Sequence, residues 1–267
     1  MALLIGSHVE QEDPIAGARV RGAEIAQISL GDPRSWKGPV VEFPGGAPAL
    51  REAAQQANLP LVVHAPFVIN VASTNNRIRI PSRKLLQKHV DAAAEIGALG
   101  VVIHGGHVVK DADPADGFAH WHKAVDGLDA KVPIFIENTA GGQHAMARTL
   151  EAIERLWDSI STAAAFAQVG FCLDTCHAHA AGLELHGLVD RIKAITGRID
   201  LVHANDSRDA FGSGADRHAN LGKGKADAAG IVEVVATSGA PAVVETPGGA
   251  EDQAADIVWL RDRIAQL

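Results

Sequence analysis

Residues 170–179 read Gly170-Phe171-Cys172-Leu173-Asp174-Thr175-Cys176-His177-Ala178-His179. The apolar part of this segment has the composition of a strand that is buried in a parallel sheet, and it ends in a carboxylate followed by imidazoles. In barrels and open α/β sheets, the C-terminal ends of such strands carry ligands and catalytic groups. A single Asp or His at such a place is more often a hydrogen-bonded structural residue, so a functional interpretation needs the pattern to recur.

Apolar runs of similar length recur along the chain, and segments with helical spacing, such as 83–94 and 190–195, separate them. The runs cover residues 3–8, 24–30, 61–64, 101–104, 134–137, 169–174, 199–203 and 242–245. Eight alternations of strand and helix predict a (β/α)8 TIM barrel, with a doubly wound open sheet as the alternative. Pro81-Ser82 is expected to open the third helix, and Gly97 and Gly100 to close it. No linker interrupts residues 1–267, so we expect a single TIM-barrel domain.

The composition indicates a protein of the cytoplasm that builds a sizeable core. Hydrophobic residues make up 47% of the 267 positions, and no apolar run approaches the length of a membrane span. Cys172 and Cys176 are too close in sequence to form a disulfide framework, which fits a reducing compartment. The formal charge of −8 argues against nucleic acid as a partner, unless the acidic residues bind metal.

Metal-capable side chains stand at the ends of six consecutive predicted strands. These residues are His64, His104, Glu137, Asp174, His203 and Glu245. His177 follows the sixth strand, and Asp216 and His218 lie in the loop after the seventh. Six unrelated buried polar groups at one rim would each need a partner, whereas a shared set of cations satisfies all of them.

The nine side chains, five imidazoles and four carboxylates, suit Zn²⁺ and also Mn²⁺ or Fe²⁺. Nine ligands are too many for one ion and fit three ions with a shared carboxylate. A cluster of divalent ions with open positions is typical of phosphoryl chemistry, so the residues alone predict a phosphodiesterase or another hydrolase.

The chain resembles the endonuclease IV family of apurinic/apyrimidinic endonucleases over nearly its whole length, and most of all its shorter, actinobacterial-type members. The segments that carry the resemblance are Gly6-Ser7-His8-Val9, 64–73, His104-Gly105-Gly106-His107, Glu137-Asn138-Thr139-Ala140-Gly141, 173–177, 203–207, 212–222 and Glu245-Thr246-Pro247-Gly248. Their order and spacing together are highly specific.

The resemblance implies a TIM barrel with three Zn²⁺ ions, although Mn²⁺ or Fe²⁺ could occupy one site. His64 and His104 would bind the first ion, and Glu137 would bridge the first and second, the pair that activates the attacking water. The second ion would be completed by Asp174, His203 and Glu245 and the third held by His177, Asp216 and His218. The implied reaction is DNA repair by hydrolysis of the phosphodiester bond 5′ to an abasic site, which leaves 3′-hydroxyl and 5′-deoxyribose-phosphate ends. Removal of blocked 3′ ends is implied as a second activity.

The expected partner is double-stranded DNA that contains abasic sites or blocked 3′ ends, and we expect the protein to act as a monomer. Three Zn²⁺ would add +6 to the formal charge of −8, which removes the charge objection. The resemblance suggests Arg34, Phe67, Asn70 and Arg217 as DNA contacts, and His8 and His107 as supports behind the ligands.

The chain departs from the family in the loops expected to handle DNA. Residues 31–36 read Gly-Asp-Pro-Arg-Ser-Trp and keep only the Arg and Trp of the usual loop pattern. Phe67 stands where a tyrosine is often found, so base stacking is retained without the hydroxyl. After His8-Val9, the usual Ser and paired Gly are replaced by Glu10-Gln11-Glu12-Asp13-Pro14.

Two other functions are possible for such a barrel. A sugar isomerase or epimerase of the xylose-isomerase-like barrels would use fewer divalent ions, and it has no evident use for His177, Asp216 and His218. A protein that only binds damaged DNA or stores metal would give the open coordination positions no role.

Overall fold

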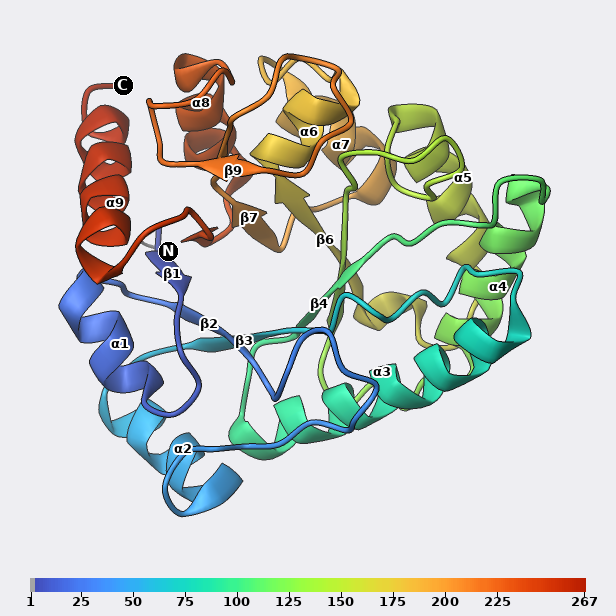
Figure 1. The fold of residues 1–267 in the computed structure, drawn as a ribbon, viewed down its shortest axis with the longest axis horizontal. Helices are drawn as coiled ribbons and strands as arrows, with labels where there is room; N and C mark the ends of the chain where they lie inside the picture. The colour runs from blue at the N-terminus through green and yellow to red at the C-terminus, as the bar shows by residue number, and fades with distance from the viewer. Residues whose placement is uncertain (1–2) are drawn as a thin grey trace.

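The computed structural model describes residues 3–267, in which eight parallel strands close into a barrel and the helices surround it (Figure 1). The strands are β1 (Ile5–His8), β2 (Ala26–Ser29), β3 (Leu61–His64), β4 (Val101–His104), β5 (Ile134–Glu137), β6 (Val169–Asp174), β7 (Leu201–His203) and β10 (Ala242–Val244). β10 pairs with both β7 and β1, which closes the barrel. The predicted TIM barrel is therefore confirmed, and the open-sheet alternative is wrong.

Helices follow the strands and cover the outside of the barrel. They are α1 (Pro14–Arg21), α2 (Gly46–Gln56), α3 (Asn76–Ile96), α4 (Pro114–Asp126), α5 (Leu150–Ile160), the 3-10 turn η1 (Phe166–Gln168), α6 (Thr175–Ala181), α7 (Leu188–Thr196), α8 (Ala228–Ser238) and α9 (Ala250–Ile264). Side chains of Asp13, Asn75, Asp113 and Thr149 accept hydrogen bonds from first-turn N–H groups, which fixes where four helices begin. None of the helices within residues 3–267 is both long and apolar enough to cross a membrane.

The predicted start of the third helix at Pro81 is wrong. Helix α3 begins five residues earlier, because the Asn75 side chain caps the N–H of Arg77. Pro81 lies inside the helix, in its second turn, where its missing N–H removes a single helical hydrogen bond. The predicted end is confirmed, since Gly97 takes up the left-handed conformation after Ile96.

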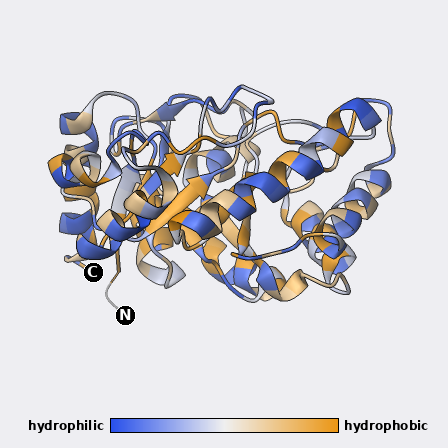
Figure 2. Ribbon diagram, turned by 90° about the horizontal axis from the view of Figure 1, so that it is seen from below, coloured by the Kyte–Doolittle hydropathy of each residue, from blue (hydrophilic) through white to orange (hydrophobic). Residues whose placement is uncertain are grey.

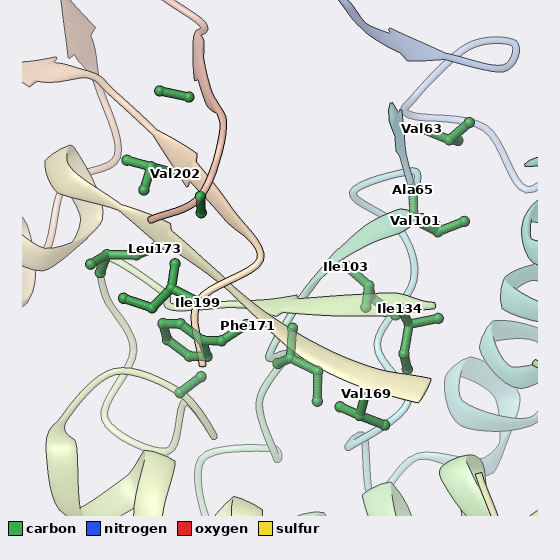
Figure 3. Close-up of a cluster of buried hydrophobic side chains, with 14 of the residues drawn as sticks. Val63, Ala65, Val101, Ile103, Ile134, Val169, Phe171, Leu173, Ile199 and Val202 are labelled. Carbon is green, nitrogen blue, oxygen red and sulfur yellow. The ribbon is translucent and has the colours of Figure 1, made fainter. Parts of the chain in front are cut away.

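Apolar side chains fill both faces of the strands. Outward-facing residues such as Val63, Val101 and Phe171 pack in the layer between the barrel and the helices (Figure 3). Ribbons coloured by hydropathy show apolar strands in the interior and helices of mixed character around them (Figure 2). An inner apolar layer lies inside the barrel and consists of Ile25, Val62, Val102, Phe135, Cys172, Leu201 and Val243.

A short antiparallel ribbon, which the sequence patterns do not predict, folds the loop after β7 back on itself. It pairs β8 (Asp206–Ser207) with β9 (His218–Ala219). The ribbon begins only three positions after His203, the last residue of β7. It therefore carries His218 beside the C-terminal ends of the barrel strands. Two strands this short contribute little by themselves, and the buried Asp206 side chain holds the ribbon in place.

Candidate metal centre

Strand alternation places the predicted ligands in a second layer, above the inner apolar layer. Side chains two positions apart on a strand lie on the same face. The residues two positions after the inner apolar layer are Gln27, His64, His104, Glu137, Asp174, His203 and Glu245. Because the strands alternate with a period of two, six of the predicted ligands point into the barrel at the same level along its axis. Gln27, which the sequence analysis did not single out, points into the barrel at that level too.

The first cluster is formed by His64, His104 and Glu137, whose ligand atoms lie within 4.8 Å of one another. Glu137 Oε2 is 3.4 Å from Nε2 of His64 and 3.1 Å from Nε2 of His104. Neighbouring strands deliver these side chains, because His104 and Glu137 are paired in register between β4 and β5.

Glu137 also belongs to the second cluster, with Asp174, His203 and Glu245. Nδ1 of His203 lies 3.0 Å from Glu137 Oε1 and 3.3 Å from Glu245 Oε2, and 3.9 Å from Asp174 Oδ2. Three carboxylates thus converge on one imidazole nitrogen. Because Glu137 presents one oxygen to each cluster, it has the geometry of a bridging ligand.

The third cluster combines the start of α6 with the β9 ribbon. Nε2 atoms of His177 and His218 lie 3.1 Å and 3.2 Å from the same oxygen of Asp216. Asp174 also groups with the two histidines, and the Cys176 thiol groups with Asp216 and His218. Burial raises the pKa of Cys176 to about 12, so the free thiol stays protonated and packs as an apolar group.

Electrostatic coupling within the clusters outweighs burial. Burial would raise the pKa of Glu137, but His104 and His203 bring it well below its usual value. Burial likewise opposes charge on His177 and His218, but nearby carboxylates such as Asp174 and Asp216 raise both pKa values, that of His218 to about 9. Without bound cations, the buried polar set is therefore held together as a network of opposite charges.

The donor atoms fit divalent cations. Glu137 Oε2, His177 Nε2 and His218 Nε2 are buried and make no hydrogen bond of good geometry within residues 3–267, although each lies 3.1–3.4 Å from an oppositely charged group. A buried polar atom without a hydrogen bond costs about 1–3 kcal/mol, so three of them in adjoining clusters need an explanation. Imidazole nitrogens and carboxylate oxygens are the ligands that Zn²⁺ and related ions take, and cations at these clusters would satisfy all three atoms.

Two buried amides that the sequence analysis missed hold predicted ligands in position. Asn138 bonds the backbone of Asp174 in both directions, at 2.9 Å and 2.7 Å. Asn205 donates to Asp174 Oδ2 at 2.7 Å and accepts from the backbone N–H of Glu245 at 2.8 Å. Asn138 directly follows Glu137, and Asn205 stands two positions after His203. Their closeness in sequence to predicted ligands is the one feature from which these two amides could have been identified.

A cavity of about 630 Å³ opens over the clusters. Its wall includes the predicted ligands His64, His104, His177, Asp216, His218 and Glu245. His8 and Phe67 also line it, and Phe67 is 59% exposed with its ring 5.6 Å from that of His64 and 5.5 Å from that of His104. An exposed aromatic ring thus stands directly beside the first cluster.

The residues predicted to contact DNA have different surroundings. The Arg34 side chain is 86% exposed and lies 3.8 Å from Asp32, and Arg217 is exposed and paired with Asp209. The amide of Asn70 bonds the backbone N–H and C=O of His107, at 3.2 Å and 2.8 Å, so it ties the loop after β3 to the loop after β4. His107 itself has an exposed side chain.

Comparison with known proteins assigns the family. A family model described as a xylose isomerase-like TIM barrel matches residues 19–263. A protein of Mycobacterium leprae named probable endonuclease 4 is 56% identical, over 98% of this chain and 99% of its own length. This chain belongs to the endonuclease IV family.

Solved structures agree with membership in the endonuclease IV family. Endonuclease IV from Thermus thermophilus has a TM-score of 0.83 and 27% identity over 99% of this chain and 100% of its own. A D-tagatose 3-epimerase-like protein has a TM-score of 0.76 at 19% identity over 99% of this chain and 97% of its own, a likeness that extends to the fold alone. These findings support the predicted metal-dependent DNA-repair endonuclease over the sugar isomerase alternative.

Proposed function

We propose that this protein is a zinc-dependent endonuclease that hydrolyses the phosphodiester bond 5′ to an abasic site in double-stranded DNA and also removes blocked 3′ ends. The observation that carries the proposal is the convergence of nine imidazole and carboxylate side chains in three adjoining clusters, and six of these side chains line one cavity. Three of their buried atoms make no hydrogen bond of good geometry within residues 3–267. Membership in the endonuclease IV family supplies the reaction class. We further propose that it works as a monomer in the cytoplasm.

Three ions would share the nine ligands. His64 and His104 would hold the first with Glu137, which extends its second oxygen to the next ion. Asp174, His203 and Glu245 would complete the second ion. His177, Asp216 and His218 would hold the third, on which both imidazoles and the carboxylate converge. Zinc suits this donor set best, and Mn²⁺ or Fe²⁺ could replace it at one site.

Cations at these positions would lower the pKa of a bound water and offset the charge of a phosphate under attack. The protein side chains supply position and shape. Glu137 is fully buried and anchored between two clusters, so it keeps their spacing fixed during turnover. Phe67 offers a ring at the cavity edge against which a base or sugar next to the lesion can pack.

Contacts with DNA would come from the exposed side chains of the loops around the cavity. Arg34 and Arg217 are exposed and positively charged, as phosphate contacts require. Asn70 would act through the loop after β4, because both ends of its amide bond the backbone of His107. His8 would support the centre from the cavity wall, 3.8 Å from Glu245.

Incision of a duplex that bears one abasic analogue tests the proposal, with metal analysis of the same sample. The purified protein should contain close to three metal ions, nick the strand 5′ to the lesion, and lose that activity after prolonged chelation. A protein that contains one or two ions and leaves the duplex intact would refute the proposal.

Variants test the assigned ligands. Glu137→Ala should abolish nicking, and Asp216→Ala should do the same from a half-exposed position where misfolding is not expected. The matched control is Glu154→Ala, which removes an exposed carboxylate from α5 and should nick normally. Normal nicking by a folded Glu137→Ala protein would refute the bridging role of Glu137.

A further inference from the structure

Gln27 on β2 is a fully buried side chain that the proposed reaction does not use. It stands two positions after Ile25 of the inner apolar layer, so it lies in the same layer as the predicted metal ligands. The strand ends before and after β2 in the chain carry His8 and His64. Of the seven positions above the inner apolar layer, Gln27 is the one whose side chain is not a predicted ligand.

The Gln27 amide contacts three groups of the centre at once. Its Nε2 donates to Glu245 Oε1 at 2.6 Å and lies 3.1 Å from His8 Nδ1. Its Oε1 lies 2.8 Å from His203 Nε2. The reverse orientation of the amide would place two acceptor oxygens 2.6 Å apart at Glu245, so the amide nitrogen must face the carboxylate.

This orientation fixes the protons on two histidines. The amide oxygen accepts only if His203 carries hydrogen on Nε2, which leaves the Nδ1 lone pair free toward the Glu137 and Glu245 carboxylates. Histidines that bind metal regularly donate their other ring N–H to such an acceptor. Likewise, the amide N–H makes Nδ1 of His8 an acceptor, so the proton of the neutral His8 ring lies on Nε2.

We propose that Gln27 is a positioning residue of the metal centre, in which one amide orients the ligands His203 and Glu245 and the cavity-wall residue His8 together. The proposal rests on the proposed function, because it requires His203 and Glu245 to bind metal. Strand β2 provides no ligand itself. Its residue Gln27 nevertheless sets the ring orientation of His203 on β7 and determines which ring nitrogen of His203 faces the metal.

A glutamine that only fills space would affect stability and not metal binding, and a neighbouring residue provides the control for that case. The neighbouring Ile28 on β2 is equally buried but faces outward, into the layer between barrel and helices. Ile28→Val should cost about 0.5–1.5 kcal/mol of stability without touching a ligand. It is therefore a matched control for a loss of packing on the same strand.

The test measures metal binding rather than turnover. Gln27→Met keeps the length of the side chain and removes all of the amide's hydrogen bonds. In competition with a chromophoric chelator, this variant should bind one zinc ion roughly 10- to 100-fold more weakly than the wild type. The absorption spectrum of the Co²⁺-substituted variant should also change, because the His203 ring is no longer held in one orientation. Ile28→Val should leave both readouts as in the wild type.

A second variant covers the case in which Gln27→Met does not fold. Gln27→Asn keeps a buried amide that is one methylene too short to reach both Glu245 and His203, and it should also lose zinc affinity and alter the Co²⁺ spectrum. Wild-type affinity and spectrum in a folded Gln27 variant would overturn the positioning role. A wild-type protein that binds no metal would instead refute the proposed function, so the two failures are distinguishable.

Discussion

Replacing Asp206 with asparagine is expected to loosen the loop after β7 that carries Asp216 and His218. The buried Asp206 carboxylate accepts four backbone hydrogen bonds. Oδ1 binds the N–H groups of Ser207 and Ala226, at 2.7 Å and 2.9 Å, and Oδ2 binds those of Gly222 and Gly224, at 3.1 Å and 2.9 Å. One side chain thus closes the whole 206–226 segment on itself.

Asparagine keeps one oxygen but turns its NH₂ group toward two backbone donors. An unsatisfied buried donor costs about 1–3 kcal/mol. For Gly222 and Gly224 together that gives about 2–6 kcal/mol, and partial access to water favours the lower half of this range. We therefore expect Asp206→Asn to lower the free energy of unfolding by about 2–4 kcal/mol, and to weaken binding of the ion proposed at Asp216 and His218.

Urea unfolding of the metal-free protein measures the first effect, and tryptic cleavage after Lys223 and Lys225, which lie in the same segment, reports local opening. Asp262→Asn removes the same charge from the exposed end of α9 and should change neither readout. If Asp206→Asn matches the wild type in stability and in tryptic cleavage, the carboxylate does not hold the segment.

Three further outcomes are expected. Arg34→Ala should reduce the slope of log affinity for abasic DNA against log salt by about one, whereas Arg19→Ala on α1 should leave it unchanged; equal slopes would place DNA contact elsewhere. Burial lowers the pKa of His89 from 6.5, so the unfolded chain binds the additional proton below that pH and stability falls as the pH falls. Urea unfolding of the metal-free protein measures how the free energy of unfolding depends on pH. Between pH 6.5 and the lowered pKa, this dependence should be weaker in His89→Gln than in the wild type, by up to about 1.4 kcal/mol per pH unit. An unchanged dependence would contradict a neutral buried His89. Gly6→Ala should cost at least about 3 kcal/mol or yield insoluble protein, because its Cβ would lie 1.7 Å from the backbone oxygen of Ile25; a stable, active variant would show that β1 and β2 can separate.

Most of the barrel could be predicted because its strands are buried on both faces. A run such as 134–137 has no polar position until its last residue, Glu137, so both the strand and its functional end are visible in the sequence. Pro81 shows where local signals mislead, since the Asn75 cap begins α3 earlier than the proline suggests.

The supporting residues could not be predicted in the same way. Gln27 and Asn205 are ordinary polar residues in the sequence, and their hydrogen bonds reach partners 218 and 31 positions away. The β8–β9 ribbon depends on Asp206, whose partners extend to Ala226. Such contacts are set by the closure of the barrel and leave no local pattern.

The sequence by itself determined the number of barrel strands, their order along the chain and the chemical identity of the side chains at their ends, because strand burial and a period of two are local properties. Only the tertiary structure decided which donor atoms share a cluster. Asp174 and His177 are three positions apart, yet Asp174 also turns toward His203 from the neighbouring strand, while His177 meets Asp216 from a distant loop. Barrel closure brings these groups within ligand distance, and the resulting concentration of buried charge gives divalent cations a place to bind.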